Sequence, residues 1–302
     1  MVDNNFPPMG GQQGIPMAQP QGNPLAKHLR QPKIYIKLPS NGEYWPGKSL
    51  EKTENGEYPV YAMTAKDEIT FKTPDALLNG QATVDVIQSC LPNIKDAWQT
   101  PSIDIDTILI AIRRASYGEK MAMTASVPKT DITKDFELNL QTLFDNYMSK
   151  EFVHTFQIDG FKVQIQPLNY KTITEGMIKA FEEQRIFAVI DDNTIQNQEK
   201  LQKFQSSFSR LTELNVQTLI KSVVAIQPDD SDQAVVNPAH IKEFIENTDA
   251  KIFNQIKEHI ESQKKQFEQQ PLSVEATEEE IEAGADKTYS IPIVFDQGNF
   301  FD

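Results

Sequence analysis

The 302-residue sequence contains one cysteine, no long apolar run and fewer basic than acidic residues. A single cysteine excludes disulfides within the chain, and the apolar neighbours of Cys90 indicate a buried, inert thiol rather than a nucleophile. No segment approaches the roughly 20 apolar residues that cross a bilayer, and the first residues lack the basic and apolar blocks of a signal peptide. We therefore expect a soluble chain without a membrane span, working in a cytoplasm.

The formal net charge is -14, from 43 acidic and 29 basic residues. Nucleic-acid binding requires a basic surface that neutralises phosphates, so this charge argues against a nucleic-acid partner. The acids are concentrated from residue 271 onward, where eight acidic residues accompany one lysine. We interpret residues 271–285 as a solvated acidic linker, with an electrostatic handle for a basic partner as the alternative.

The sequence also lacks the patterns that usually mark an active site or a metal site. It has no glycine-rich phosphate loop, no G-x-S-x-G elbow and no second cysteine for a zinc pair. His240 and His259 lie too far apart in sequence to share one face of a helical turn as metal ligands. Neighbouring acids such as Asp191 and Asp192 are typical of solvated surface charge rather than of a hydrolase pair. We predict a non-enzymatic protein with no catalytic residues, no metal and no cofactor.

What the sequence does contain predicts an α+β fold in successive parts. Residues 1–24 are rich in proline, glycine and glutamine, so we expect a disordered arm. Residues 25–168 form the predicted α+β domain, in which the Asp159-Gly160 pair between alternating flanks predicts a β-hairpin. Its other predicted elements are strands at 33–38, 58–63 and 69–72 and helices at 75–91 and 104–117.

Residues 169–270 predict a mainly helical second half. Thr172 and Glu175 form a potential capping box at its start. A second helix carries an apolar stripe at helical spacing, and Asn237-Pro238 opens a third that runs to Ile260. The simplest packing joins the last two helices in an antiparallel hairpin. We predict that the stripe faces a core, with a partner-binding face as the alternative; its residues are Leu201, Phe204, Phe208, Leu211, Leu214 and Leu219.

The last segment, 286–302, is predicted to be a short strand with an aromatic tip. Two adjacent phenylalanines at a chain end are costly to leave in water, since each can bury roughly 150–250 Å². The strand can close the core of its own chain, or it can capture a partner by strand addition or through an aromatic pocket. For the second possibility the candidate partner-binding residues are Phe295, Phe300 and Phe301.

Four segments together resemble the baseplate hub proteins of T4-like contractile-tailed phages. They are Ile-Lys-Leu-Pro-Ser-Asn-Gly (36–42), Tyr-Ala-Met-Thr-Ala-Lys-Asp-Glu (61–68), Lys-Thr-Pro-Asp-Ala-Leu-Leu-Asn-Gly (72–80) and Ala-Ile-Arg-Arg-Ala-Ser-Tyr-Gly (111–118). The resemblance extends over roughly residues 25–225 and includes the closing Ile-Pro-Ile-Val-Phe-Asp strand.

The resemblance implies a structural subunit or assembly factor of the baseplate central hub, with other baseplate or tail hub proteins as partners. It implies a place in the host cytoplasm during assembly and in the virion tail baseplate. A cytoplasmic adaptor or chaperone absent from the virion is the alternative, and the oligomeric state stays open. Members of this family often carry a Cys-Pro-x-Cys zinc knuckle. Here the matching stretch, 125–130, has no cysteine, so we expect a degenerate ribbon-like segment near 125–166, held without zinc.

Overall fold

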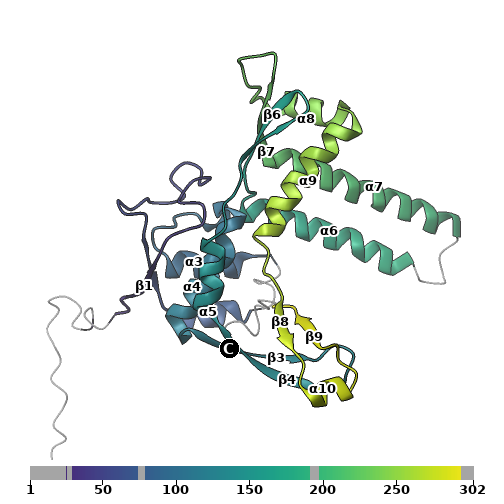
Figure 1. The fold of residues 1–302 in the computed structure, drawn as a ribbon. Helices are drawn as coiled ribbons and strands as arrows, with labels where there is room; N and C mark the ends of the chain where they lie inside the picture. Colours follow the sequence, from purple (N-terminus) through teal and green to yellow (C-terminus); the bar gives the residue numbers. More distant parts are fainter. Residues whose placement is uncertain (1–24, 26–28, 74–78, 191–196, 294–302) are drawn as a thin grey trace, which may run out of the picture. The chain divides into compact units, whose positions relative to one another are not determined.

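The computed structural model describes residues 25, 29–73, 79–190 and 197–293 (Figure 1). Residues 1–31 and 32–302 are separate units, and every element below belongs to the second. The arm predicted at 1–24 lies outside the described residues. The named elements are, in chain order, β1 (Pro32–Ile36), β2 (Tyr58–Tyr61), α1 (Ala65–Phe71), α3 (Gln81–Cys90), η2 (Ala97–Gln99), α4 (Ser102–Tyr117), β3 (Lys120–Ser126), β4 (Thr133–Asn139), α5 (Leu140–Met148), β5 (Thr155–Ile158), β6 (Phe161–Ile165), α6 (Tyr170–Ile190), α7 (Asn197–Ser222), β7 (Val223–Pro228), α8 (Pro238–Asn247), α9 (Ala250–Gln266), β8 (Leu272–Glu275), α10 (Glu278–Glu282) and β9 (Thr288–Ile291).

This order confirms the predicted α+β class, with strands and helices first, helices dominating the second half and a short strand near the end. The largest core lies between the antiparallel pair β1–β2 and helices α3, α4 and α5. α4 is apolar on nearly every side, and Ile108, Ile110 and Ile112 are completely buried, as in a central helix. It ends at Gly118, whose φ of 93° suits a residue without a Cβ.

A second core surrounds the three-stranded antiparallel sheet β5–β6–β7. The Asp159-Gly160 turn joins β5 to β6, with Gly160 at φ 77°, which confirms the predicted hairpin. The sequence predicts continued helix where the structure has β7. This prediction is wrong because no glycine or proline marks the change from α7 to β7. The predicted single helix from Asn237 to Ile260 is also wrong. It is divided into α8 and α9, and Asp249 caps the second by accepting from backbone N–H groups of its first turn.

A third, smaller core forms where the hairpin β3–β4 meets the pair β8–β9. The linker interpretation of residues 271–285 is therefore wrong, because this stretch contains β8 and α10. Two acids of this region form ion pairs with the β3–β4 hairpin. Lys134 Nζ lies 2.8 Å from Glu280 Oε1, and Lys129 Nζ lies 2.7 Å from Asp286 Oδ2. Glu280 is only 4 % exposed and also accepts from the Tyr289 hydroxyl.

Two local predictions need correction because side-chain caps decide the structure. The predicted strand at 69–72 is the end of helix α1, which begins with a capping box between Thr64 and Asp67. The start of α6 is not a box at Thr172. Asn169 Oδ1 accepts from the backbone N–H of Thr172 at 2.9 Å, and the helix begins at Tyr170.

The helical hairpin of this fold is α6–α7 rather than the pair predicted from the last two helices. The two helices lie side by side in Figure 1. Arg210 Nε on α7 lies 2.6 Å from Glu183 Oε1 on α6, and the hydroxyl of Ser207 donates to the same carboxylate. The base of the hairpin is anchored: Tyr170 stacks on Trp98 at a centroid distance of 5.7 Å.

Candidate functional site

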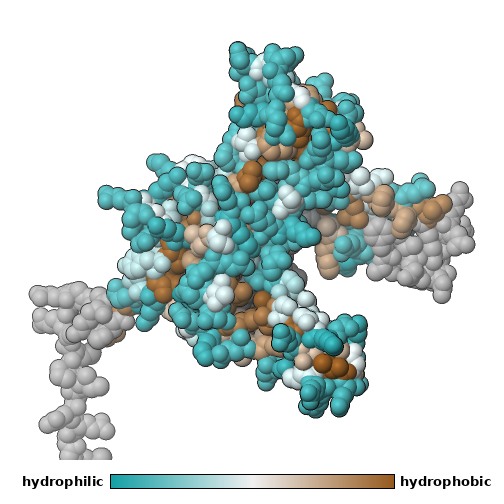
Figure 2. Space-filling model, in the orientation of Figure 1, coloured by the Kyte–Doolittle hydropathy of each residue, from teal (hydrophilic) through white to brown (hydrophobic). Residues whose placement is uncertain are grey.

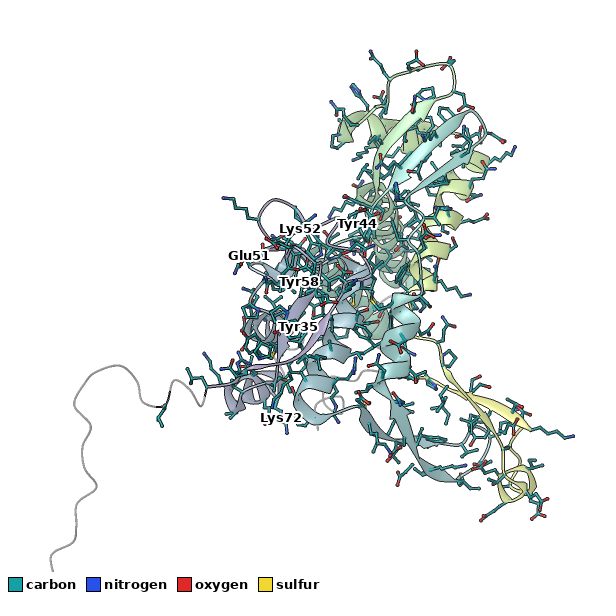
Figure 3. The ribbon with its side chains drawn as sticks, turned by 60° about the vertical axis from the view of Figure 1, so that its left-hand side comes forward. Tyr35, Tyr44, Glu51, Lys52, Tyr58 and Lys72 are labelled. Carbon is teal, nitrogen blue, oxygen red and sulfur yellow. The ribbon has the colours of Figure 1, made fainter. Side chains whose placement is uncertain are left out.

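A buried carboxylate on α4 organises the first of the four segments that carry the family resemblance. Asp104 Oδ1 accepts from the backbone N–H of Ser40 at 2.9 Å, and Oδ2 accepts from the Ser40 hydroxyl at 2.5 Å and from Trp45 Nε1 at 2.9 Å. The Ser40 oxygen in turn accepts from the N–H of Gly42. The turn is tight at Gly42, where a Cβ would lie 3.0 Å from the Tyr58 hydroxyl. Figure 3 labels Tyr58 among the side chains of this region. Asp104 therefore holds a loop, because its partners all belong to that loop.

Burial raises the pKa of Asp104 to about 6, against the opposing effect of its hydrogen bonds from Ser40 and Trp45. A raised carboxyl pKa in a cleft is typical of a general acid. Here the residue is completely buried, with no exposed surface. Substrate cannot reach it, so its role in this arrangement is to position Ser40 and Trp45.

The next segments of the resemblance are joined to one another in the same way. The N–H of Met63, just before α1, donates to Ser116 Oγ on α4 at 2.9 Å. The neighbouring Tyr117 hydroxyl donates to Glu68 Oε1 at 2.9 Å. Residues 61–68 and 111–118 thus lock α1 onto α4, and the shared motifs build a scaffold.

A second group of ionisable side chains lies between α4 and α5. The Tyr147 hydroxyl donates to Asp106 Oδ2 at 2.9 Å, and Lys150 Nζ lies 4.5 Å from the Tyr147 ring centroid. Burial raises the pKa of Asp106 and lowers that of Lys150, while burial and the Asp106 charge raise that of Tyr147. Tyr147 is 1 % exposed, so this group joins two helices rather than facing a substrate.

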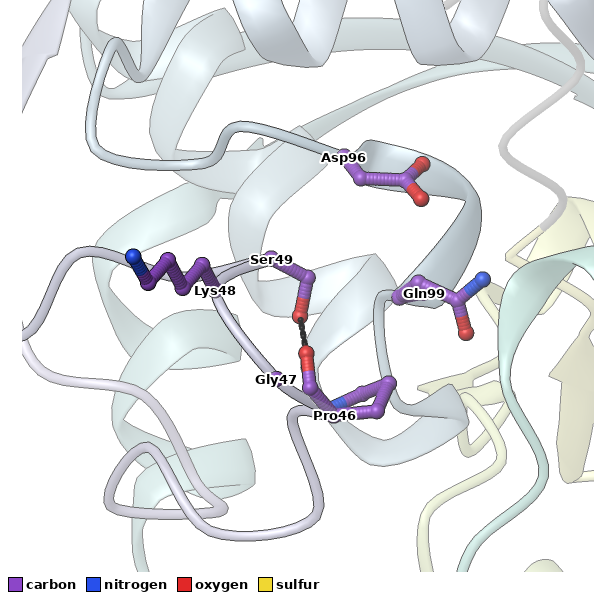
Figure 4. A pocket seen from close by; sticks show the side chains of 6 residues that line it. All are labelled: Pro46, Gly47, Lys48, Ser49, Asp96 and Gln99. Carbon is purple, nitrogen blue, oxygen red and sulfur yellow. Dashed lines mark hydrogen bonds between the residues drawn. The ribbon is translucent and has the colours of Figure 1, made fainter.

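A surface groove of about 420 Å³ lies beside the loop that follows Trp45 (Figure 4). Two of its polar side chains are engaged in local structure. Ser49 Oγ donates to the Pro46 carbonyl at 2.7 Å, and Asp96 Oδ1 caps η2 by accepting from the N–H of Trp98. The groove is wide open to solvent, and its lining brings no base and nucleophile together.

The side chains that commonly bind metal ions are dispersed over the described residues. Within that part of the chain, no three His, Cys, Asp or Glu side chains come together to hold a metal ion. Nor does any described helix combine the length and apolar character needed to cross a membrane. The stretch matching the zinc knuckle is the tip of the β3–β4 hairpin. There the N–H of Val127 donates to the Ile132 carbonyl, and Thr130 Oγ1 donates to the carbonyl of Val127.

The predicted partner-binding residues Phe295, Phe300 and Phe301 lie outside the described residues. The strand before them is described, and it closes a core of its own chain. β9 pairs with β8, and Tyr289 and Ile291 are buried against the β3–β4 hairpin.

Several exposed apolar side chains lie on the α6–α7 hairpin, and we call this surface the apolar face. Phe181 and Phe208 are each 60 % exposed. Some of its apolar atoms are visible beside the grey atoms of the hairpin in Figure 2. Its five members, with their exposed fractions, are Met177 (56 %), Phe181 (60 %), Leu201 (57 %), Phe204 (46 %) and Phe208 (60 %).

The sequence predicted that the α7 stripe faces a core, with a partner-binding face as the alternative. The prediction is wrong for Leu201 and Phe208, which are 57 % and 60 % exposed. Met177 and Phe181 on α6 were not predicted to share a face with this stripe, although their four-residue spacing places them on one helix side.

Comparison with known proteins identifies the family. Neither the search of curated proteins nor the search of solved structures returned a match. The family model described as T4 bacteriophage base plate protein matches residues 32–282, which includes the Asp104 scaffold and the α6–α7 hairpin. The chain belongs to the T4 bacteriophage base plate protein family.

Proposed function

We propose that the chain is a non-enzymatic protein of the central hub of the phage baseplate, acting as a structural subunit or assembly factor. Its partners are other baseplate or tail hub proteins rather than nucleic acid, which the net charge of -14 disfavours. It works in the host cytoplasm during assembly and in the virion tail baseplate. Family membership is the observation that carries the proposal. The apolar face of the α6–α7 hairpin supports a role in association, because contiguous apolar patches on soluble proteins commonly mark interaction sites.

The C-terminal tip is the second proposed docking element, through Phe295, Phe300 and Phe301. Ile291 is 2 % exposed and Ile293 is 8 % exposed, so the last described residues before these rings belong to the folded body. Aromatic anchors at interface centres commonly contribute about 2 kcal/mol or more each.

Quantitative mass spectrometry of purified virions tests the proposal. A structural subunit is present in a fixed ratio to the other baseplate proteins, whereas an assembly factor co-purifies only with baseplate intermediates. Absence from both would contradict the proposal and favour the alternative, an adaptor or chaperone that acts outside the assembly.

Truncation separates the role of the aromatic tip from that of β9. Deleting residues 299–302 removes Phe300 and Phe301 but leaves Thr288–Ile291 intact. If the tip docks, the melting temperature is unchanged and binding to baseplate partners is lost. A truncated protein that melts earlier but still binds its partners would show that the tip is part of the fold.

A further inference from the structure

The apolar face is continuous across both helices of the hairpin. The contact line between the helices is marked by Glu183 on α6 and by Ser207 and Arg210 on α7. At about 100° per residue, the apolar side chains of each helix are turned away from that line in the same rotational sense. Because the helices are antiparallel, the same sense on each brings Phe181 and Phe208 to the same side of the hairpin.

Most charged side chains on the described part of the hairpin are turned away from the apolar face. Taking Glu183 and Ser207 as reference positions, they fall on the contact line or on the side opposite to the apolar face. They are Lys171, Glu175, Lys179, Glu182, Glu183, Lys203, Arg210, Glu213 and Lys221. The exception is Arg185, which stands four residues after Phe181 and therefore on the same side of α6. On the described part of α7 the apolar face carries no charge, and Thr212 and Asn215 lie on it as neutral polar residues.

Net charge distinguishes this segment from the rest of the chain. Residues 170–222 contain seven basic and seven acidic residues, so the net charge of -14 resides entirely outside them. Two copies that approach through most other surfaces meet like charge, which disfavours association. Two copies that approach through the apolar face bring together identical surfaces that carry no acidic side chain among the described residues, with Arg185 at the edge of each.

The size of the face also matches what a dimer needs. Its five side chains expose on the order of 500 Å², taking about 200 Å² for each fully exposed large side chain. A standard interface covers about 800 Å² per partner, of which a little over half is apolar. The apolar face supplies that apolar portion without rearrangement of the helices.

We propose that the apolar face binds the same face of a second copy of the chain, so that two α6–α7 hairpins form an antiparallel four-helix bundle. A two-fold interface is self-complementary. Where one residue of the first copy contacts a second residue of the other copy, the same contact occurs again with the two copies exchanged. Four-helix packing covers apolar stripes of this kind with knobs-into-holes contacts. The inference goes beyond the hub assignment and does not depend on it.

Sedimentation equilibrium of the full chain tests the proposal, because the monomer mass is 34.2 kDa. We expect the wild type to sediment with about twice this mass at tens of micromolar protein. The double variant F181E/F208E places two charges in the face and should sediment as a monomer, with at least a tenfold weaker association. The matched control is Ile69→Glu, which replaces a side chain that is 70 % exposed on α1 and should leave the dimer intact.

Thermal unfolding of dilute protein, followed by circular dichroism, checks that the variant is folded. F181E/F208E should melt within a few degrees of the wild type. Should that variant unfold, the milder Leu201→Gln, at a position 57 % exposed, provides the same test by weakening the dimer. A monomeric wild type, a dimer that survives F181E/F208E, or one that Ile69→Glu disrupts equally would each overturn the proposal. A monomer whose apolar face binds another baseplate protein instead would overturn it as well.

Discussion

The core around α4 and the α6–α7 hairpin use apolar residues in opposite ways. On α4, Ile108, Ile110 and Ile112 have no exposed surface, and hydrogen bonds from the neighbouring loops enclose the helix. On the hairpin, Phe181 and Phe208 leave more than half of their surface in water. The first region is complete within one chain. The second leaves its apolar side chains exposed, and we propose that another surface covers them.

The largest expected effect comes from emptying the core. Ile110→Ala removes a side chain with no exposed surface, and we expect it to lower the free energy of unfolding by about 2–5 kcal/mol. Urea unfolding followed by tryptophan fluorescence measures this loss. A cost below about 1 kcal/mol would mean that the core relaxes around the gap, and the contrast with the hairpin would be weakened.

The buried carboxylate gives the core a pH dependence that the hairpin should lack. Burial raises the pKa of Asp104 from 3.8 to about 6, so between these values the folded state binds the proton and the unfolded state releases it. Stability from this group is therefore fully present below about pH 4 and falls as pH rises to 6, by at most about 3 kcal/mol.

Asp104→Asn isolates this contribution, because an amide does not titrate. The variant is expected to be less stable than the wild type, since Ser40 and Trp45 both donate to the carboxylate and one donor of the amide would face them. Its unfolding free energy should fall less steeply between pH 4 and 6 than that of the wild type. Equal slopes would show that Asp104 does not retain its proton.

A smaller effect, on local stability, is expected where the acidic segment joins the β3–β4 hairpin. The Lys134 ammonium holds the pKa of Glu280 below its usual value. That stabilisation is present above the ordinary glutamate pKa of about 4.3 and is lost as pH falls through the lower folded value. Lys134→Met should make the β8–β9 segment more susceptible to limited proteolysis at pH 7. Lys162→Met, on the exposed side of β6, should not.

The smallest expected effect is on the hairpin. The stripe predicted to face a core would make Phe208→Ala costly, but the ring is 60 % exposed in the folded chain. We therefore expect the substitution to lower the unfolding free energy of dilute protein by less than about 1 kcal/mol. A loss comparable to that of Ile110→Ala, in the same urea titration, would show that Phe208 is buried in solution.

Local patterns in the sequence predicted much of the first half of the fold. The Asp159-Gly160 turn and the apolar run of α4 each determine their element within a few residues. Features that depend on distant partners could not be predicted in this way. From the sequence, Glu280 is expected to be a solvated acid, because its partner Lys134 lies 146 residues away. The burial of Asp104 likewise depends on Ser40, which is distant in sequence.

The apolar stripe of α7 also depends on partners that local sequence patterns do not reveal. Its spacing predicts a helix side that must be covered, which is correct for Leu219, at 8 % exposed, and not for Leu201, at 57 %. Periodicity indicates that a face is apolar, but not whether its cover lies in the same chain. The C-terminal residues Phe295, Phe300 and Phe301 remain a prediction, since they lie outside the described residues.

Hydrogen–deuterium exchange of α4 and α7, in dilute protein and at tens of micromolar protein, compares the two regions most directly. We expect amides of residues 108–112 to exchange only through global unfolding in both samples. Amides of residues 201–212 should exchange faster in the dilute protein and slow at least tenfold at the higher concentration, where the dimer forms. Amides in 201–212 as protected as those of α4 in dilute protein, or unchanged at the higher concentration, would contradict the claim that a second copy covers the hairpin.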